Sequence, residues 1–146
     1  MTTITQAKDD ISAAFYDAWI LSEASKNIPV FFDNLDSDAG DKSADAPWAR
    51  LSIKHFDSAF SKQSLADSDG VKNYQRDGIA TVGIFVPIGE GASRSDELIS
   101  IVMNSFEGKR TANGVWFRNV RFNEVGPDGA WFQINIKANF NYTENK

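Results

Sequence analysis

The sequence has no cysteine and one histidine among its 146 residues. Without cysteine the chain can form no disulfide, no thiolate zinc site and no cysteine nucleophile. One histidine is too few for a His-rich metal site, and a His-dependent catalytic triad would have to use that one residue. No apolar run reaches the roughly 18–20 residues that a membrane-spanning helix needs. The N-terminus also lacks the basic start and apolar core of a signal peptide. We therefore expect a protein made in the cytoplasm, without cofactor or membrane partner.

An excess of positive charge is also missing. The 15 Lys and Arg against 20 Asp and Glu give a net charge of −5. Binding to duplex DNA depends on neutralising several phosphates with cations, so a duplex-binding role is disfavoured. Hydrophobic residues make up 42% of the chain, including 11 Phe and 4 Trp, which is enough for one core. We expect a single domain over residues 1–146.

Hydrophobic periodicity predicts two helices. Apolar residues at spacings of three and four predict the first over residues 4–25, capped by Thr3 or Thr5. The second is predicted to begin at Ser93 or Ser95, to run to about Phe106 and to close at Gly108.

Alternating and β-branched segments predict five strands. Their expected ranges are 28–32, 48–56, 74–87, 115–125 and 130–142. The stretch Gly126-Pro127-Asp128-Gly129 is predicted to be the turn between the last two strands. We interpret residues 33–47 and 57–73 as loops. The order α-β-β-β-α-β-β predicts an α+β domain with a mostly antiparallel sheet and both helices packed on one face.

Three patterns imitate catalytic or ligand-binding motifs. Asn34, Asp36, Asp38 and Asp45 have the spacing of a calcium loop, but the sixth position is Ala39 where that loop needs glycine. A glycine turn at residues 89–91 resembles a nucleotide-binding turn, but it lacks the third glycine and the Gly-Lys-Ser/Thr signature. His55 has no nucleophile beside it in any recognised motif. We interpret these features as a solvated loop, a structural turn and a strand histidine, and we expect no enzyme.

Aromatic and arginine side chains are the better candidates for function. The strands and loops carry more large aromatic residues than the outer face of a small sheet comfortably exposes, and such patches often mark protein contacts. The candidate contact residues are Trp48, Arg50, Phe56, Phe60, Arg76, Trp116 and Trp131. The competing interpretation is that a helix or the last hairpin covers several of the aromatic residues.

Two runs in the second half carry a family resemblance: VGIFVPIGEGASRSDELISIVMNSFEGKR and GVWFRNVRFNEVGPDGAWFQINIKANFNY. They resemble the tail terminator-like (tail completion) proteins of long-tailed bacteriophages. The matching positions are Gly89 and Gly91, Phe106 and Gly108, Gly129 and Trp131, and the closing Phe140 and Tyr142. The family's Pro-Trp-x-Arg-like segment corresponds to residues 47–50, so the resemblance covers nearly the whole chain.

This resemblance implies a structural protein of the virion. Members of the family form a hexameric ring on the last ring of the tail tube protein, stop its polymerisation and face the head-tail connector protein. DNA would pass through the ring without specific binding, and an acidic lumen would keep it from sticking. The candidate lumen residues are Asp33, Asp36, Asp38, Asp41, Asp45, Asp67 and Asp69.

Other functions stay open at this point. The chain could form a different ring of the same tail, such as a tube subunit, which would polymerise where a terminator stops at one ring. It could also be a small ligand-binding α+β domain with a pocket between helix and sheet. A hydrolase built on His55 and a loop carboxylate is the weakest alternative.

Overall fold

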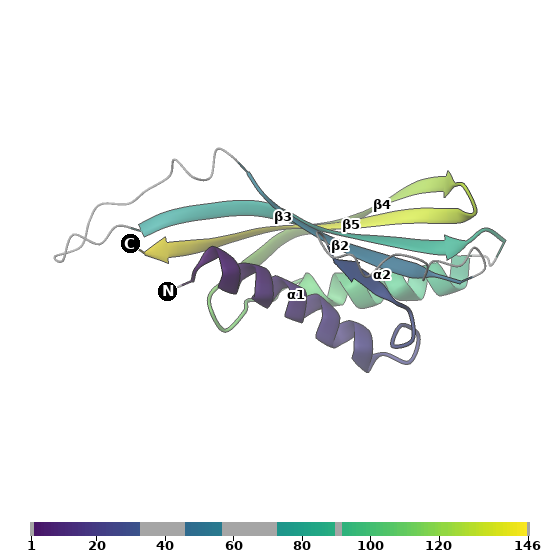
Figure 1. Cartoon of the computed structure of the whole chain (residues 1–146), viewed down its shortest axis with the longest axis horizontal. Coiled ribbons are helices and arrows are strands. Elements are labelled where there is room, and N and C mark those ends of the chain that lie inside the picture. Colours follow the sequence, from purple (N-terminus) through teal and green to yellow (C-terminus); the bar gives the residue numbers. More distant parts are fainter. Residues whose placement is uncertain (1, 33–45, 57–72, 90–91, 146) are drawn as a thin grey trace.

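The computed structural model describes residues 2–32, 46–56, 73–89 and 92–145. The described chain forms two helices and five strands, which confirms the predicted α+β class (Figure 1). Their bounds are α1 Ile4–Leu21, β1 Val30–Phe32, β2 Trp48–His55, β3 Asn73–Pro87, α2 Ala92–Phe106, β4 Trp116–Asp128 and β5 Trp131–Asn145.

The five strands form one sheet in the order β1-β2-β3-β5-β4. The short β1 is parallel to β2, and the three other pairs are antiparallel. The two central strands, β3 and β5, are 15 residues each and pair along their whole length. The prediction of a mostly antiparallel sheet is therefore confirmed.

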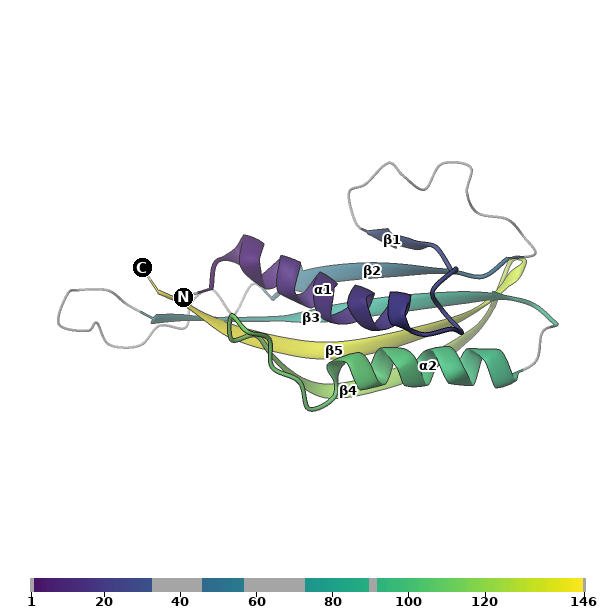
Figure 2. The same cartoon turned by 90° about the horizontal axis from the view of Figure 1, so that it is seen from below.

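Both helices lie on the same face of this sheet (Figures 1 and 2). The register places Leu51, Val82 and Ile136 in one row across the three inner strands, and all three are buried against the helices. From the helix layer, Ile11 and Phe15 of α1 join the same core. Because side chains alternate along a strand, the intervening residues must lie on the opposite face of the sheet.

The first helix begins directly after its capping residue, Thr3. The Thr3 side chain accepts a hydrogen bond from the Gln6 amide, and the Gln6 side chain accepts one from the Thr3 amide. This reciprocal pair satisfies two amides that the first turn would otherwise leave unpaired. The helix ends at Leu21 instead of residue 25, and a compact turn follows, held by the Trp19 indole, which donates to the Ile28 carbonyl at 3.0 Å.

Two further predicted boundaries are wrong. Helix α2 begins at Ala92, so Ser93 and Ser95 lie inside it. The last hairpin does not turn at residues 126–129, because β4 continues through Pro127 to Asp128 and pairs there with Trp131. Strand β4 lies at the sheet edge, where proline costs no ladder hydrogen bond, and a register shift between Glu124 and Gly126 absorbs the irregularity. The loop is therefore only Gly129-Ala130.

Candidate functional site: the open sheet face and the interhelical groove

One face of the sheet is not covered by any described helix or strand (Figure 1). We call it the open sheet face and define it by the strand residues that alternate with the core. Its centre is polar, with Gln133, Asn135, Asn139 and Asn141 along β5. The Gln133 amide donates to Asn135 Oδ1 at 3.1 Å. A row of amides on a long sheet leaves many donors and acceptors available for a partner.

An aromatic cluster closes one end of the open sheet face. It consists of Phe31, Trp48, Phe85 and the half-buried Trp131. The rings of Trp48 and Phe85 are stacked with centroids 3.9 Å apart, and Trp131 meets Trp48 edge-on at 5.9 Å. Since Trp48 is only 6% exposed and Phe85 9% exposed, these rings cover one another. The cluster works mainly as a second small core on this face.

Cations dominate the charge of the open sheet face. They are Arg50, Lys54, Arg118, Arg121 and Lys137. Among the strand side chains described on this face, Asp77 is the one carboxylate. Two of the arginines are held in place: Arg118 donates to Asn141 Oδ1 at 2.8 Å and Arg121 donates to Asn139 Oδ1 at 3.0 Å. The face is thus positive although the whole chain is negative.

The helix layer on the opposite side has the opposite sign. We define it as residues 2–28 with residues 92–107. It carries three cations, Lys8, Lys26 and Arg94. Its seven carboxylates are Asp9, Asp10, Asp17, Glu23, Asp96, Glu97 and Glu107. Of these only Asp10 is half-buried, and the others are exposed. The two faces of the domain therefore attract opposite charges.

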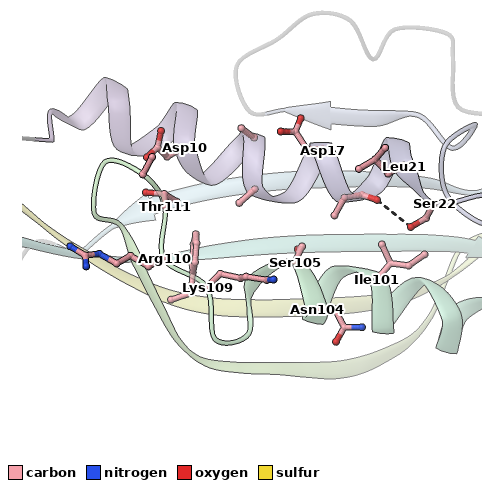
Figure 3. Close-up of a pocket in the computed structure, with 15 residues that line it drawn as sticks. Asp10, Asp17, Leu21, Ser22, Ile101, Asn104, Ser105, Lys109, Arg110 and Thr111 are labelled. Atoms are coloured by element: carbon pink, nitrogen blue, oxygen red, sulfur yellow. Dashed lines mark hydrogen bonds between the residues drawn. The ribbon is translucent and has the colours of Figure 1, made fainter.

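A groove of about 640 Å³ runs between the two helices (Figure 3). Its lining includes Ala14, Ala18 and Ile101, and the connection after α2 contributes Lys109 and Arg110. Asp10 and Asp17 line it from α1, seven residues apart and thus on one stripe of the helix. The groove is mixed in character, with apolar side chains and charges of both signs.

The carboxylate of Asp10 is the most constrained polar group of the groove. Asn113 donates to its Oδ1 at 3.0 Å. Its Oδ2 is buried and has no hydrogen-bond partner among the described residues. Nearby, the Thr2 hydroxyl donates to the Asn113 carbonyl, which fastens the start of the chain to the same connection. A buried acceptor of this kind favours a donor from outside the described chain.

A buried polar cluster lies on the helix side of the sheet, near the start of β3 and the end of β5. Arg76 donates through Nε and Nη2 to Glu144 Oε1, at 3.2 and 2.9 Å, and both side chains are buried. His55 Nε2 lies 2.7 Å from the Tyr142 hydroxyl. Burial lowers the pKa of His55, with Lys8 and Arg76 acting in the same direction and Glu144 against them. Burial also raises the pKa of Tyr142 to about 12, so its hydroxyl stays protonated and can donate to neutral His55.

The predicted contact residues do not share one environment. Arg50, Phe56 and Trp116 are exposed, and Arg50 and Trp116 both point to the open side of the sheet. Trp48 and Trp131 belong to the aromatic cluster, so neighbouring rings cover much of both side chains. The competing interpretation also expected several aromatic residues to be covered. Arg76 lies on the helix side, enclosed by its ion pair, and we no longer treat it as a contact residue.

Several predicted residues lie outside the described part of the chain. They are Phe60 and all seven candidate lumen residues: Asp33, Asp36, Asp38, Asp41, Asp45, Asp67 and Asp69. The calcium-like pattern lies there too. Of the glycine turn, Gly89 is described and has a positive φ of 99°. Within the described ranges, no group of three or more His, Cys, Asp or Glu residues is arranged to hold a metal ion.

Sequence reasoning missed the cations of the open sheet face other than Arg50. Lys54, Arg118, Arg121 and Lys137 occupy outward positions of alternating strands, so the period-two pattern contained the signal. That pattern does not place both arginines of β4 on one face, because the bulge at Asn119 shifts the alternation between Arg118 and Arg121. The groove was missed because no sequence pattern indicates how far apart two helices lie.

Comparisons with known proteins bear on the fold alone. No protein-family model matches the chain, and no curated protein matches it by sequence. Twenty-four solved chains match its structure. One has a TM-score of 0.70 and 13% sequence identity, and the match covers 99% of this chain and 97% of that one. The described helices include none long and apolar enough to cross a membrane. A likeness at this identity shows that the two chains share a fold.

Proposed function

We propose that the chain is a structural subunit of a bacteriophage tail, of the tail terminator-like kind. In this role it assembles with copies of itself into a ring, with six copies expected, at the head-proximal end of the virion's tail. The ring binds the tail tube protein on one side and the head-tail connector protein on the other. DNA passes through the ring without specific binding.

The observation that carries the proposal is the open sheet face. It spans the width of a five-stranded sheet, no described element covers it, and it combines aromatic, amide and cationic side chains. Surfaces of this composition are typical of protein contacts. The resemblance to tail terminator-like proteins supports the same function. Two of the glycines that carry it, Gly108 after α2 and Gly129 in the hairpin loop, have positive φ and therefore favour glycine.

The proposal predicts a closed ring in solution. Light scattering should give a mass of about six times 16.2 kDa, and electron microscopy should show particles with a pore. Mixed with tail tube subunits, the rings should bind tube ends and stop their growth. A protein that stays monomeric and binds no tube ends would contradict the proposal. Long tubes formed by this chain alone would favour the tube-subunit alternative.

Asp10 favours a second candidate, binding of a small ligand in the interhelical groove. Its buried Oδ2, without a partner among the described residues, could accept a hydrogen bond from such a ligand. Native mass spectrometry of the purified protein tests this directly. A bound small molecule that is lost in Asp10→Asn would favour the ligand-binding function, and an unliganded mass would count against it.

A further inference from the structure

The charges of this domain are separated between its two sides. The open sheet face carries five cations and, among described strand side chains, one carboxylate. The helix layer carries seven carboxylates and three cations, and it stays acidic when Lys109 and Arg110, which line its groove, are added. The eleven Lys and Arg and the eleven Asp and Glu of the described residues balance, so an even distribution would leave both sides near neutral. Their separation makes the two sides complementary to each other.

We infer that the open sheet face of one copy binds the helix layer of the next copy, an inference that rests on the proposed ring function. Each subunit then offers one cationic and one acidic surface to its two neighbours. Such a contact is heterologous, because different patches meet, and contacts of this kind generate rings when the rotation between copies closes. Electrostatic complementarity would fix which face meets which and speed the encounter.

The competing contact between two identical sheet faces is disfavoured by the same charges. Two copies meeting sheet to sheet would bring Arg118 and Lys54 of one copy against the cations of the other. Like charges facing each other across an interface oppose association. Two helix layers meeting would likewise oppose Asp9 and Asp17 to a second acidic surface. Only the sheet-to-helix arrangement pairs opposite signs.

A single strand of nucleic acid is also a polyanion, so it is a competing candidate partner for the cationic open sheet face. Sheets that bind single strands stack the bases on exposed aromatic rings. Here Trp48 and Phe85 stack on each other and are 6% and 9% exposed, so they offer no open platform. Trp116 is exposed at the other end of the face, but the Arg110 guanidinium lies over its ring, 4.6 Å from the centroid. The observations therefore favour an acidic protein surface as the partner.

Charge reversal on one side at a time tests the inference. Lys54→Glu/Arg118→Glu reverses two exposed cations on β2 and β4, and Asp9→Lys/Asp17→Lys reverses two exposed carboxylates of α1. Each variant alone should associate about a hundredfold more weakly than the unchanged protein, measured by sedimentation. An equal mixture of the two should recover the assembled mass, because the acidic sheet of one then meets the basic helix layer of the other.

A charge-conserving control isolates the effect of charge. Lys54→Arg/Arg118→Lys keeps both charges and should assemble like the unchanged protein. Circular dichroism and thermal unfolding should show that every variant folds like the unchanged protein. A variant that fails this check is replaced by Lys137→Glu on the sheet or Glu107→Lys on the helix layer.

The possible outcomes separate the inference from the function on which it rests. If the unchanged protein forms no oligomer, the proposed function fails. If it forms rings that neither charge-reversed variant weakens, the function stands and the inference is overturned. Recovery of mass when the sheet variant is mixed with unchanged protein would indicate sheet-to-sheet contact and also overturn it. Binding of a fluorescent poly(dT) oligonucleotide that the sheet variant loses, with unaltered oligomers, would assign the face to a polyanion instead.

Discussion

Gly78 lies in β3 at a point where a side chain has no room. A Cβ atom at this position would lie 2.3 Å from the Lys54 carbonyl oxygen and 2.4 Å from the Phe140 ring. The ring of Phe140 is the cross-strand neighbour that fills the space above the glycine. The backbone oxygen belongs to a paired strand and cannot retreat cheaply, so the fold depends on glycine here.

Replacing Gly78 with alanine should therefore destabilise the protein. We expect Gly78→Ala to lower the free energy of unfolding by about 2–3 kcal/mol, as overpacking in a core does. The matched control is Gly83→Ala in the same strand, where the nearest atom is a side-chain ring carbon of Phe85 at 3.2 Å and no backbone atom is in the way. That variant should lose less than about 1 kcal/mol. Urea unfolding measures both, and equal losses would contradict the steric explanation.

The ion pair of Arg76 and Glu144 makes a second residue-scale prediction. Both side chains are buried and joined by two hydrogen bonds. Glu144→Ala leaves a buried guanidinium without its carboxylate and should cost about 3–5 kcal/mol of stability. Arg76→Met/Glu144→Met removes both charges and should cost clearly less. If the double variant is as unstable as the single one, the unpaired charge is not the cause.

His55 predicts how stability depends on pH. Its pKa in the folded protein lies below the usual 6.5, mainly because it is partly buried. The unfolded chain therefore takes up a proton at His55 before the folded chain does. Stability should fall as the pH drops through 6.5 and stop falling, for this residue, below the folded pKa. His55→Gln should show a shallower fall between about pH 7.5 and about pH 5.5 in urea unfolding. Parallel curves would contradict this assignment.

Helix α1 allows a test at the scale of an element. Thr3 caps the helix through its side-chain oxygen, whereas Thr5 lies two residues later on the exposed helix surface. Thr3→Ala should lower the free energy of unfolding by about 1 kcal/mol, because the Gln6 amide loses its side-chain acceptor. Thr5→Ala should be neutral or slightly stabilising, since alanine is the better helix former. Thermal unfolding compares the two, and a smaller loss in Thr3→Ala would contradict the capping role.

The elements with a sustained period could be predicted from the sequence, and those decided by a single turn could not. The alternation in β5 and the helical stripe through Ile11 and Phe15 both persist over several repeats, so each residue supports the others. The hairpin turn depends on where an edge strand tolerates Pro127. A bulge at the sheet edge moved the turn to Gly129, and no local pattern reveals that bulge.

The candidate surfaces could be predicted only in part from the sequence, for a related reason. Strand alternation places Trp48 on the side away from the helices, but whether a ring there is exposed depends on Phe85 and Trp131, which come from other strands. Likewise Arg76 reads as a surface arginine until its pairing with Glu144, 68 residues away, is known. Contacts between distant segments decide which outward residues are free to bind a partner.

At the scale of the whole molecule, the separation of charge makes association sensitive to salt. The cations of the sheet side and the carboxylates of the helix side that we expect to meet are mostly exposed before association. Attraction between exposed charges is screened over about 10 Å at 0.1 M salt and about 3 Å at 1 M. Assembly held mainly by these charges should therefore weaken as salt is added.

We expect sedimentation velocity to show the assembled species at about 0.1 M sodium chloride and a shift toward monomer at about 1 M. Contact through the aromatic cluster of Phe31, Trp48, Phe85 and Trp131 would behave differently, because burial of apolar surface is not weakened by screening. Sodium sulfate separates the two cases further, since it strengthens apolar burial while still screening charge. An assembled mass that holds or grows in both salts would mean that the aromatic end, and not the opposed charges, joins the copies.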